Sequence, residues 1–192
     1  FWNFTTDQLT LSRGSFGAPR FGGELGFPLT RRVELVVGAS HARRSAGSEY
    51  RDLVGTDDLP IAQSTRLVRT PVSIGLRLNL TPAGRTLGSL AWVPTRTVPW
   101  IGAGGGAMRW SLRQSGEFVD APTNDIFRNT FVADGWAPLT YVAAGLDRHL
   151  SPRTALSLSA RYTFARDALG EDFRGFPRLN LSGVSLQAGL TW

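Results

Sequence analysis

The last nine residues, Val184-Ser-Leu-Gln-Ala-Gly-Leu-Thr-Trp192, decide the fold class of this chain. Small or polar residues alternate there with apolar ones, which stand at Val184, Leu186, Ala188, Leu190 and Trp192. A period of two residues places the two sets on opposite faces of a β-strand, because successive side chains of a strand point to opposite sides. The segment therefore predicts an amphipathic strand.

The same alternation recurs along the rest of the 192-residue chain. It is clearest at 154–165 and 68–80, where leucine, valine and aromatic residues alternate with serine, glycine and arginine. Weaker copies occur at 20–29, 32–44, 98–114 and 136–148, and a first strand is placed within 2–12. The pattern predicts an all-β chain of about eight strands, each about ten residues long.

The predicted connections alternate in length, which is typical of a small transmembrane barrel. Residues 28–31 and 149–153 form tight turns, 81–97 is intermediate, and 45–62, 115–135 and 167–180 are long. Outer-membrane barrels have short periplasmic turns and long extracellular loops. We therefore expect an eight-stranded antiparallel up-and-down transmembrane β-barrel, with both termini on the periplasmic side.

A soluble sandwich or lipocalin-like barrel would show the same alternation with its apolar face turned inward. Two features favour an outward apolar face. The polar face carries many small residues that suit a narrow interior, and aromatic residues stand at strand ends, where they would form the two interfacial girdles. Besides Trp192, these predicted interfacial residues are Trp92, Trp100, Trp110, Trp136 and Tyr141.

The closing strand, with apolar residues at every second place back from Trp192, resembles the C-terminal signal that the outer-membrane assembly machinery recognises. Together with the strand count, the chain resembles the small outer-membrane β-barrel family, the OmpA-like and OmpW-like eight-stranded barrels. The resemblance implies one barrel domain over 1–192 in a bacterial outer membrane, contacting membrane lipid and lipopolysaccharide. Residues 1–19 then hold the first strand, or belong to the first long loop if that strand lies upstream.

Composition excludes several classes of protein. All 21 basic residues are arginine, against 15 acidic residues, and the formal net charge is +6. The arginines are spread along the chain rather than clustered, which argues against a nucleic-acid partner. The absence of cysteine removes disulfides, zinc–thiolate sites and thiol catalysis, and no uncharged stretch reaches the roughly 18 residues of a spanning helix.

Charged residues on the polar face are the main candidates for a functional site. A charge facing hydrocarbon costs about 2 to 4 kcal/mol at mid-bilayer, so an interior position is favoured. We expect these charges to pair across a narrow interior and plug it, because unpaired buried charges are costly. If some arginines stay unpaired, they would line a narrow anion-preferring pore. The candidates are Glu24, Glu34, Arg69, Arg77, Arg109, Arg113 and Arg161.

Catalytic, cofactor and metal signals are weak. Ser40 and His41 are adjacent, so they point to opposite faces of a strand, and His149 has no partner nearby in sequence. The glycine run 102–107 approaches a dinucleotide fingerprint, but the period of two continues through it, so glycine there allows a bend or a close approach. The acidic pairs Asp57-Asp58 and Glu171-Asp172 do not match a calcium loop.

The sequence therefore predicts a non-enzymatic envelope barrel with no metal or cofactor, a charge-plugged interior and acidic outer loops. Its role is structural, or it binds a ligand or an unidentified envelope partner through those loops. The first alternative is a narrow channel for anions or small amphipathic solutes. The second is a soluble lipid-carrying barrel. An envelope enzyme acting on lipid would need a serine and a histidine that converge at the rim.

Overall fold

The structure is a computed structural model that describes residues 2–55, 58–87, 91–120, 123, 125–151, 154–170, 173, 175 and 177–191. It is almost entirely β-structure, as the alternation predicts. Its elements are α1 (Trp2–Gln8), the 3-10 turn η1 (Arg13–Phe16), β1 (Arg20–Pro28), β2 (Val33–Val54), β3 (Pro60–Asn79), β4 (Gly84–Leu87), β5 (Ala91–Pro94), β6 (Thr97–Val119), β7 (Ile126–His149), β8 (Ala155–Asp167), β9 (Leu179–Asn180) and β10 (Gly183–Thr191).

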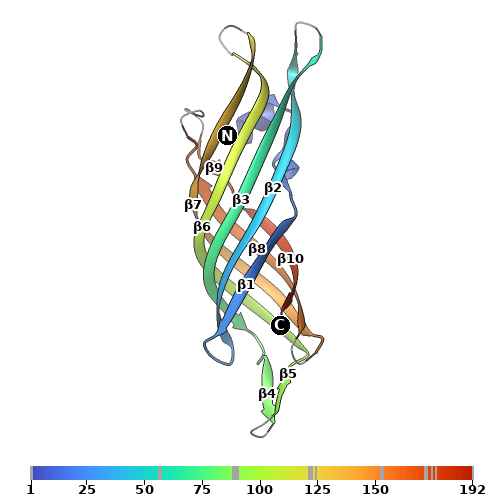
Figure 1. The fold of residues 1–192 in the computed structure, drawn as a ribbon, viewed down its shortest axis with the longest axis vertical. Coiled ribbons are helices and arrows are strands. Elements are labelled where there is room, and N and C mark those ends of the chain that lie inside the picture. Colours follow the sequence, from blue (N-terminus) through green and yellow to red (C-terminus); the bar gives the residue numbers. More distant parts are fainter. Residues whose placement is uncertain are drawn as a thin grey trace.

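One antiparallel sheet contains most of the chain. Its strands follow each other in the order β1-β2-β3-β6-β7-β8-β10, and the short β9 also pairs with β8. The sheet is strongly curled, so that it encloses an interior (Figure 1). Neighbours in the sheet are also neighbours along the chain apart from the β4–β5 hairpin, which is the up-and-down topology that the sequence predicts.

The two ends of the curled sheet differ. At the lower end in Figure 1 lie the β1–β2 and β7–β8 connections and the separate β4–β5 hairpin. At the upper end lie the β2–β3 and β6–β7 connections, together with the chain between β8 and β10. Strands β2, β3, β6 and β7 contain 22, 20, 23 and 24 residues, about twice the roughly ten that cross a bilayer.

Much of what the sequence analysis treats as long loops therefore belongs to these strands. Residues 45–54 continue β2, 115–119 continue β6 and 126–135 begin β7. Acidic residues of the predicted outer loops, such as Glu49 and Glu117, lie on these upper extensions. The predicted pairs Asp57-Asp58 and Glu171-Asp172 fall largely outside the described residues, since only Asp58 is described.

In the lower half of the sheet, apolar side chains point outward. On β3 the outward residues Val72, Ile74, Leu76 and Leu78 are 44%, 51%, 52% and 41% exposed. The residues between them, ending with Arg77 and Asn79, point inward and are less exposed. The lower parts of β7 and β8 repeat this arrangement, with Val142 and Leu158 outward and exposed. An outward apolar face is the arrangement that the sequence analysis favours.

In the upper half the polarity of the two faces is reversed. The inward residues Leu67, Met108, Trp110 and Leu112 are at most 3% exposed and belong to one apolar cluster. Many outward positions there carry polar or charged residues instead, for example Arg66 on β3, although Val132 of β7 is also exposed. The change from apolar-out to apolar-in is clearest on β6 and β7, whereas the upper inward face of β3 also carries the buried Gln63 and Thr65.

The N-terminal segment fills the upper interior. Trp2, Leu9, Leu11 and Phe16 are buried in the same apolar cluster as the inward residues of the upper strands. The helix α1 lies near the upper end in Figure 1, and an isolated bridge joins Leu9 to Tyr50 of β2. The first strand expected within 2–12 is thus replaced by a helix, because these apolar residues cover a core rather than extend the sheet.

This placement also corrects the expected position of the termini. The N-terminal helix α1 lies near the upper end, whereas β10 runs down to the lower end, so the two ends of the chain are on opposite sides (Figure 1). The physical reason is the number of strands in the main path of the sheet, which is seven. In an alternating sheet, a first and a seventh strand run in the same direction.

Candidate functional site: a charged and partly filled interior

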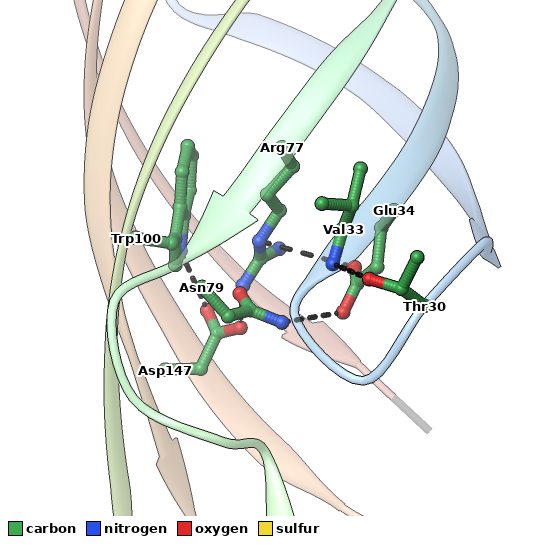
Figure 2. A network of polar contacts seen from close by, with 7 residues as sticks. All are labelled: Thr30, Val33, Glu34, Arg77, Asn79, Trp100 and Asp147. Carbon is green, nitrogen blue, oxygen red and sulfur yellow. Dashed lines mark hydrogen bonds and ion pairs between the residues drawn. The ribbon is translucent and has the colours of Figure 1, made fainter.

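The lower interior contains a network centred on Arg77 (Figure 2). Its guanidinium forms an ion pair with Asp147, and its Nε atom lies 3.9 Å from a carboxylate oxygen of Glu34. Asn79 donates a hydrogen bond of 2.8 Å to Glu34, and the indole of Trp100 donates one of 3.1 Å to Asp147. Arg77 also stacks over the Trp100 ring, 4.2 Å from its centroid. The two carboxylates thus share one guanidinium.

The strand register brings these residues together. Glu34 of β2 is the direct partner of Arg77 of β3, and Trp100 of β6 is the direct partner of Gly145 of β7. A Cβ atom at Gly145 would lie 2.5 Å from the Trp100 ring, so this glycine makes room for the indole. Thr30 accepts a 3.0 Å hydrogen bond from the Val33 amide and thereby closes the turn that leads into β2 (Figure 2).

A second charged group lies around Arg161 of β8. Its guanidinium donates a 2.8 Å hydrogen bond to Ser73 and lies 3.3 Å from a carboxylate oxygen of Glu24. It also lies over the Tyr141 ring, 3.5 Å from the centroid. Arg161 is 8% exposed, so this charge is buried, and the groups that contact it come from three other strands, β1, β3 and β7.

Glycines create the space for Tyr141. Gly75 of β3 and Gly104 of β6 are direct partners in the ladder. A Cβ atom at Gly75 would lie 2.3 Å from the Tyr141 hydroxyl, and one at Gly104 would lie 2.7 Å from its ring. The expectation that the glycine run 102–107 continues a strand and permits a close approach is therefore confirmed. A helix that could bind a dinucleotide does not start there.

The upper interior is held by apolar packing with a few polar ties. The Trp110 indole donates a 2.7 Å hydrogen bond to Asp167, and the Trp2 indole donates one of 2.8 Å to the Asn180 carbonyl. Arg69 donates a 2.9 Å hydrogen bond to the Phe16 carbonyl, so an interior arginine anchors the N-terminal segment. The apolar cluster lies above the two charged groups along the interior.

The structure brings five of the seven predicted interior charges inside the sheet: Glu24, Glu34, Arg69, Arg77 and Arg161. The other two, Arg109 and Arg113, are exposed on the outer face of β6. Arg109 forms an ion pair there with Asp134 of β7. The prediction was wrong for both because it extended the polarity of the lower half upward, whereas Met108, Trp110 and Leu112 turn inward to the apolar cluster.

The predicted interfacial aromatic residues fall into an interior group and an outward one. Trp100, Trp110 and Tyr141 are 7%, 1% and 7% exposed and belong to the interior, so their expected outward position was wrong. Trp136 points outward and is 59% exposed. The Trp92 side chain and Trp192 lie outside the described residues. In the interior, the two indoles and the phenol each contact a charged side chain.

The described residues of the predicted assembly signal, which exclude Trp192, lie on one face of β10. Val184, Leu186 and Leu190 are 71%, 82% and 59% exposed, and Ala188 is also exposed. Their direct partners on β8 include Tyr162, Ala160 and Leu156. The alternation thus places the apolar set outward. Recognition by an assembly machinery stays a prediction.

Sequence reasoning missed three interior residues: Asp147, Asn79 and Arg20. Asp147 follows the alternation of Val142, Ala144 and Leu146, so extending that phase by one residue would have placed it on the polar face. Asn79 follows Arg77 by two positions and shares its face for the same reason. Arg20 stands four positions before Glu24, so the alternation of 20–29 would have placed it on the same polar face.

A cavity of about 940 Å³ lies beside the charged groups. Its lining includes Arg20, Glu24, Arg161 and Leu186, so it reaches from the interior to the facing sides of β1 and β10. Arg20 lies 3.5 Å from the Ser185 hydroxyl of β10. The interior is therefore not filled on the side of these two strands.

Catalytic and metal-binding groups do not converge in the described part of the chain. His41 points outward and shares a 2.9 Å hydrogen bond with Thr70, while Ser40 next to it lines the interior cavity. Within the described residues, no group of three histidine or acidic side chains has the spacing of a metal site. Among these residues, also, no helix has the length and apolar composition needed to cross a membrane.

Comparisons with known proteins give no match. A scan against protein-family models found no matching family, and searches of curated proteins and of solved structures found no match.

Proposed function

We propose that this chain is a non-enzymatic outer-membrane β-barrel protein whose interior is closed by its own side chains. The lower half would lie in the bilayer, and the upper half would project from it as an ordered surface for an envelope partner or ligand. The observation that carries the proposal is the reversal of polarity along the strands. A lipid-embedded barrel turns its apolar side chains outward, whereas a barrel in water turns them inward.

The height of the outward apolar surface supports a bilayer-spanning lower half. On β7, the outward residues from Trp136 to Leu146 are mostly apolar. At a rise of about 3.3 Å per residue and a tilt of about 45°, this stretch is about 23 Å high, close to the roughly 25 Å apolar band of outer-membrane barrels. The exposed Trp136 would lie at the upper interface, where tryptophan is enriched.

Outward arginines directly above this surface support a contact with phosphorylated lipid. Arg66 of β3 and Arg113 of β6 are direct partners in the ladder and both are exposed. Like charges directly opposite each other are destabilising unless an anion lies between them. Among the ion pairs of the described residues, neither arginine has a carboxylate partner. Lipopolysaccharide phosphates would supply such anions, so we propose membrane lipid and lipopolysaccharide as partners.

A blocked interior supports a structural or binding role over a transport role. The charges of Arg77 and Arg161 are compensated by carboxylates from other strands, and the apolar cluster lies above them. The narrow anion-preferring channel stays as the alternative, because the cavity of about 940 Å³ is lined by Arg20, Arg77 and Arg161. The soluble lipid carrier is disfavoured by the outward apolar residues of the lower half.

Thiol labelling in lipid vesicles tests the proposed membrane position, and the absence of native cysteine makes single replacements unambiguous. Ile74→Cys, at an outward site 51% exposed in the protein alone, is expected to resist a membrane-impermeant maleimide in vesicles. Arg66→Cys, outward on the same strand but above the apolar surface, is expected to react fully. Equal labelling of both sites in vesicles would contradict a membrane-embedded lower half.

Conductance in a planar bilayer separates the closed barrel from the channel. We expect the wild-type protein to show no steady current, because charged groups and the apolar cluster block the interior in series. An anion-selective current that Arg77→Ala weakens would instead favour the channel. Arg109→Ala is the matched control, because its guanidinium lies on the outer face and its removal leaves the interior unchanged.

A further inference from the structure

The curled sheet ends in two strands that run in the same direction. Each neighbouring pair from β1 through β2, β3, β6, β7 and β8 to β10 is antiparallel, so direction alternates along the seven strands of this path. β1 and β10 therefore both run downward (Figure 1). In the described part of the chain, no ladder joins these two edges.

Both edges are incomplete as they stand. A free edge presents a row of unpaired N–H and C=O groups, which invites aggregation in water and costs several kcal/mol per group in lipid. Eight of the nine residues of β1 are exposed, and a Cβ atom at Gly23, Gly183 or Gly189 would meet nothing within 4 Å. Among the described residues, the side-chain hydrogen bond between these two strands is the 3.5 Å contact of Arg20 with Ser185. An arginine side chain is long enough to reach across a gap of one strand.

We propose that one further strand of the same protein, formed by the residues that precede Phe1, fills this gap. Such a strand must run upward, because only then is it antiparallel to both β1 and β10. It would end at the upper end of β10, and the chain enters the structure there. The Trp2 indole is hydrogen-bonded to the Asn180 carbonyl at 2.8 Å, three residues before β10 begins.

This strand gives residues 1–19 a defined place. They form the first upper connection, which folds back into the interior as α1 and η1 before β1 descends. The added strand needs about nine to eleven residues to match its neighbours and to cross a bilayer. It closes an antiparallel barrel with an even number of strands. It also separates the cavity of about 940 Å³ beside β1 and β10 from the surroundings of the barrel.

Hydrogen exchange tests the proposal on the protein with its natural preceding residues, compared with chain 1–192 in the same detergent. The natural extension is expected to slow amide exchange in β1 and β10 on the order of tenfold or more, because each edge gains a ladder. A Gly-Ser extension of equal length is the matched control and is expected to leave both edges fast. The protein must remain monomeric by light scattering.

Cysteine pairs provide a second, independent measurement in a chain without native cysteine. With a strand in the gap, Arg20→Cys and Ser185→Cys are two strand spacings apart, roughly 9.6 Å, which is beyond the roughly 7 Å Cα limit of a disulfide. Gly23→Cys with Ala39→Cys, which are direct partners in the ladder, is expected to form a disulfide and serves as the control.

Three results would overturn the added strand. These are fast exchange in β1 and β10 of the extended protein, protection that appears only in a dimer, and an efficient Arg20→Cys to Ser185→Cys disulfide. Protection only in a dimer would show that a second copy of the chain fills the gap. The disulfide would show that β1 and β10 lie next to each other without a strand between them. Neither measurement depends on ion current or on membrane insertion. Failure of the added-strand proposal is therefore distinguishable from failure of the proposed function.

Discussion

Replacing Asp147 by alanine is expected to lower the free energy of unfolding by about 3 to 5 kcal/mol. Asp147 and Arg77 side chains are 13% and 14% exposed, so the pair is largely removed from water. Removal of the carboxylate leaves the guanidinium with Glu34 at 3.9 Å as its remaining ionic partner. It also leaves the Trp100 indole without its acceptor. Chemical unfolding in detergent micelles measures the loss.

A second ion pair provides the matched control. Asp134 is paired with Arg109, but these side chains are 46% and 45% exposed on the outer face. An exposed pair contributes about 0 to 1 kcal/mol, so Asp134→Ala is expected to have a small effect. The double variant Arg77→Met, Asp147→Leu is expected to recover most of the stability, because no buried charge is left alone. Equal losses for Asp147→Ala and Asp134→Ala would show that the interior network does not stabilise the fold.

Replacing Trp110 by alanine is expected to cost about 3 to 5 kcal/mol in the same measurement. Trp110 is 1% exposed at the centre of the upper apolar cluster, and its indole is hydrogen-bonded to Asp167. The substitution therefore opens a cavity next to the N-terminal segment and leaves Asp167 without this donor. We also expect faster proteolysis of residues 2–19, because Trp2 and Phe16 lose packing in the same cluster.

Trp136 is the control for this prediction. It lies on the neighbouring strand β7, but it points outward and is 59% exposed. Trp136→Ala in micelles is expected to change the free energy of unfolding by roughly 0.5 kcal/mol or less, as for other surface substitutions. If both variants lost the same stability, the upper interior would not be the packed core that its burial indicates.

Alternation in the sequence predicted the lower half of the molecule well. The segments 68–80 and 154–165 became the lower part of β3 and most of β8, with the leucines outward and the serines inward. Arg77 and Arg161 on the polar face were correctly placed inside. The prediction succeeded because each face keeps one polarity over the whole segment. Once one residue is assigned to a face, the alternation therefore assigns its neighbours correctly.

The upper half could not be predicted in the same way. Arg109 and Trp110 continue the alternation of β6 without a break, but the outward set changes from apolar to charged. The two-residue period alone does not reveal which face is inward, because the alternation has the same spacing in the lower and upper halves of the strand. The inward turn of Trp110 depends on the apolar residues of α1 and η1, which are about 100 positions away in the chain.

The sequence by itself determined an all-β, up-and-down chain, the phase of its regular strands and most of the charges available to its polar face. These properties are local, because they follow from the two-residue repeat of a strand and from short turns. Only the tertiary structure decided which face is inward at each height, that Asp147 is the partner of Arg77, and that β1 and β10 run in the same direction. These properties are non-local, because they depend on packing between distant segments and on the number of strands in the sheet.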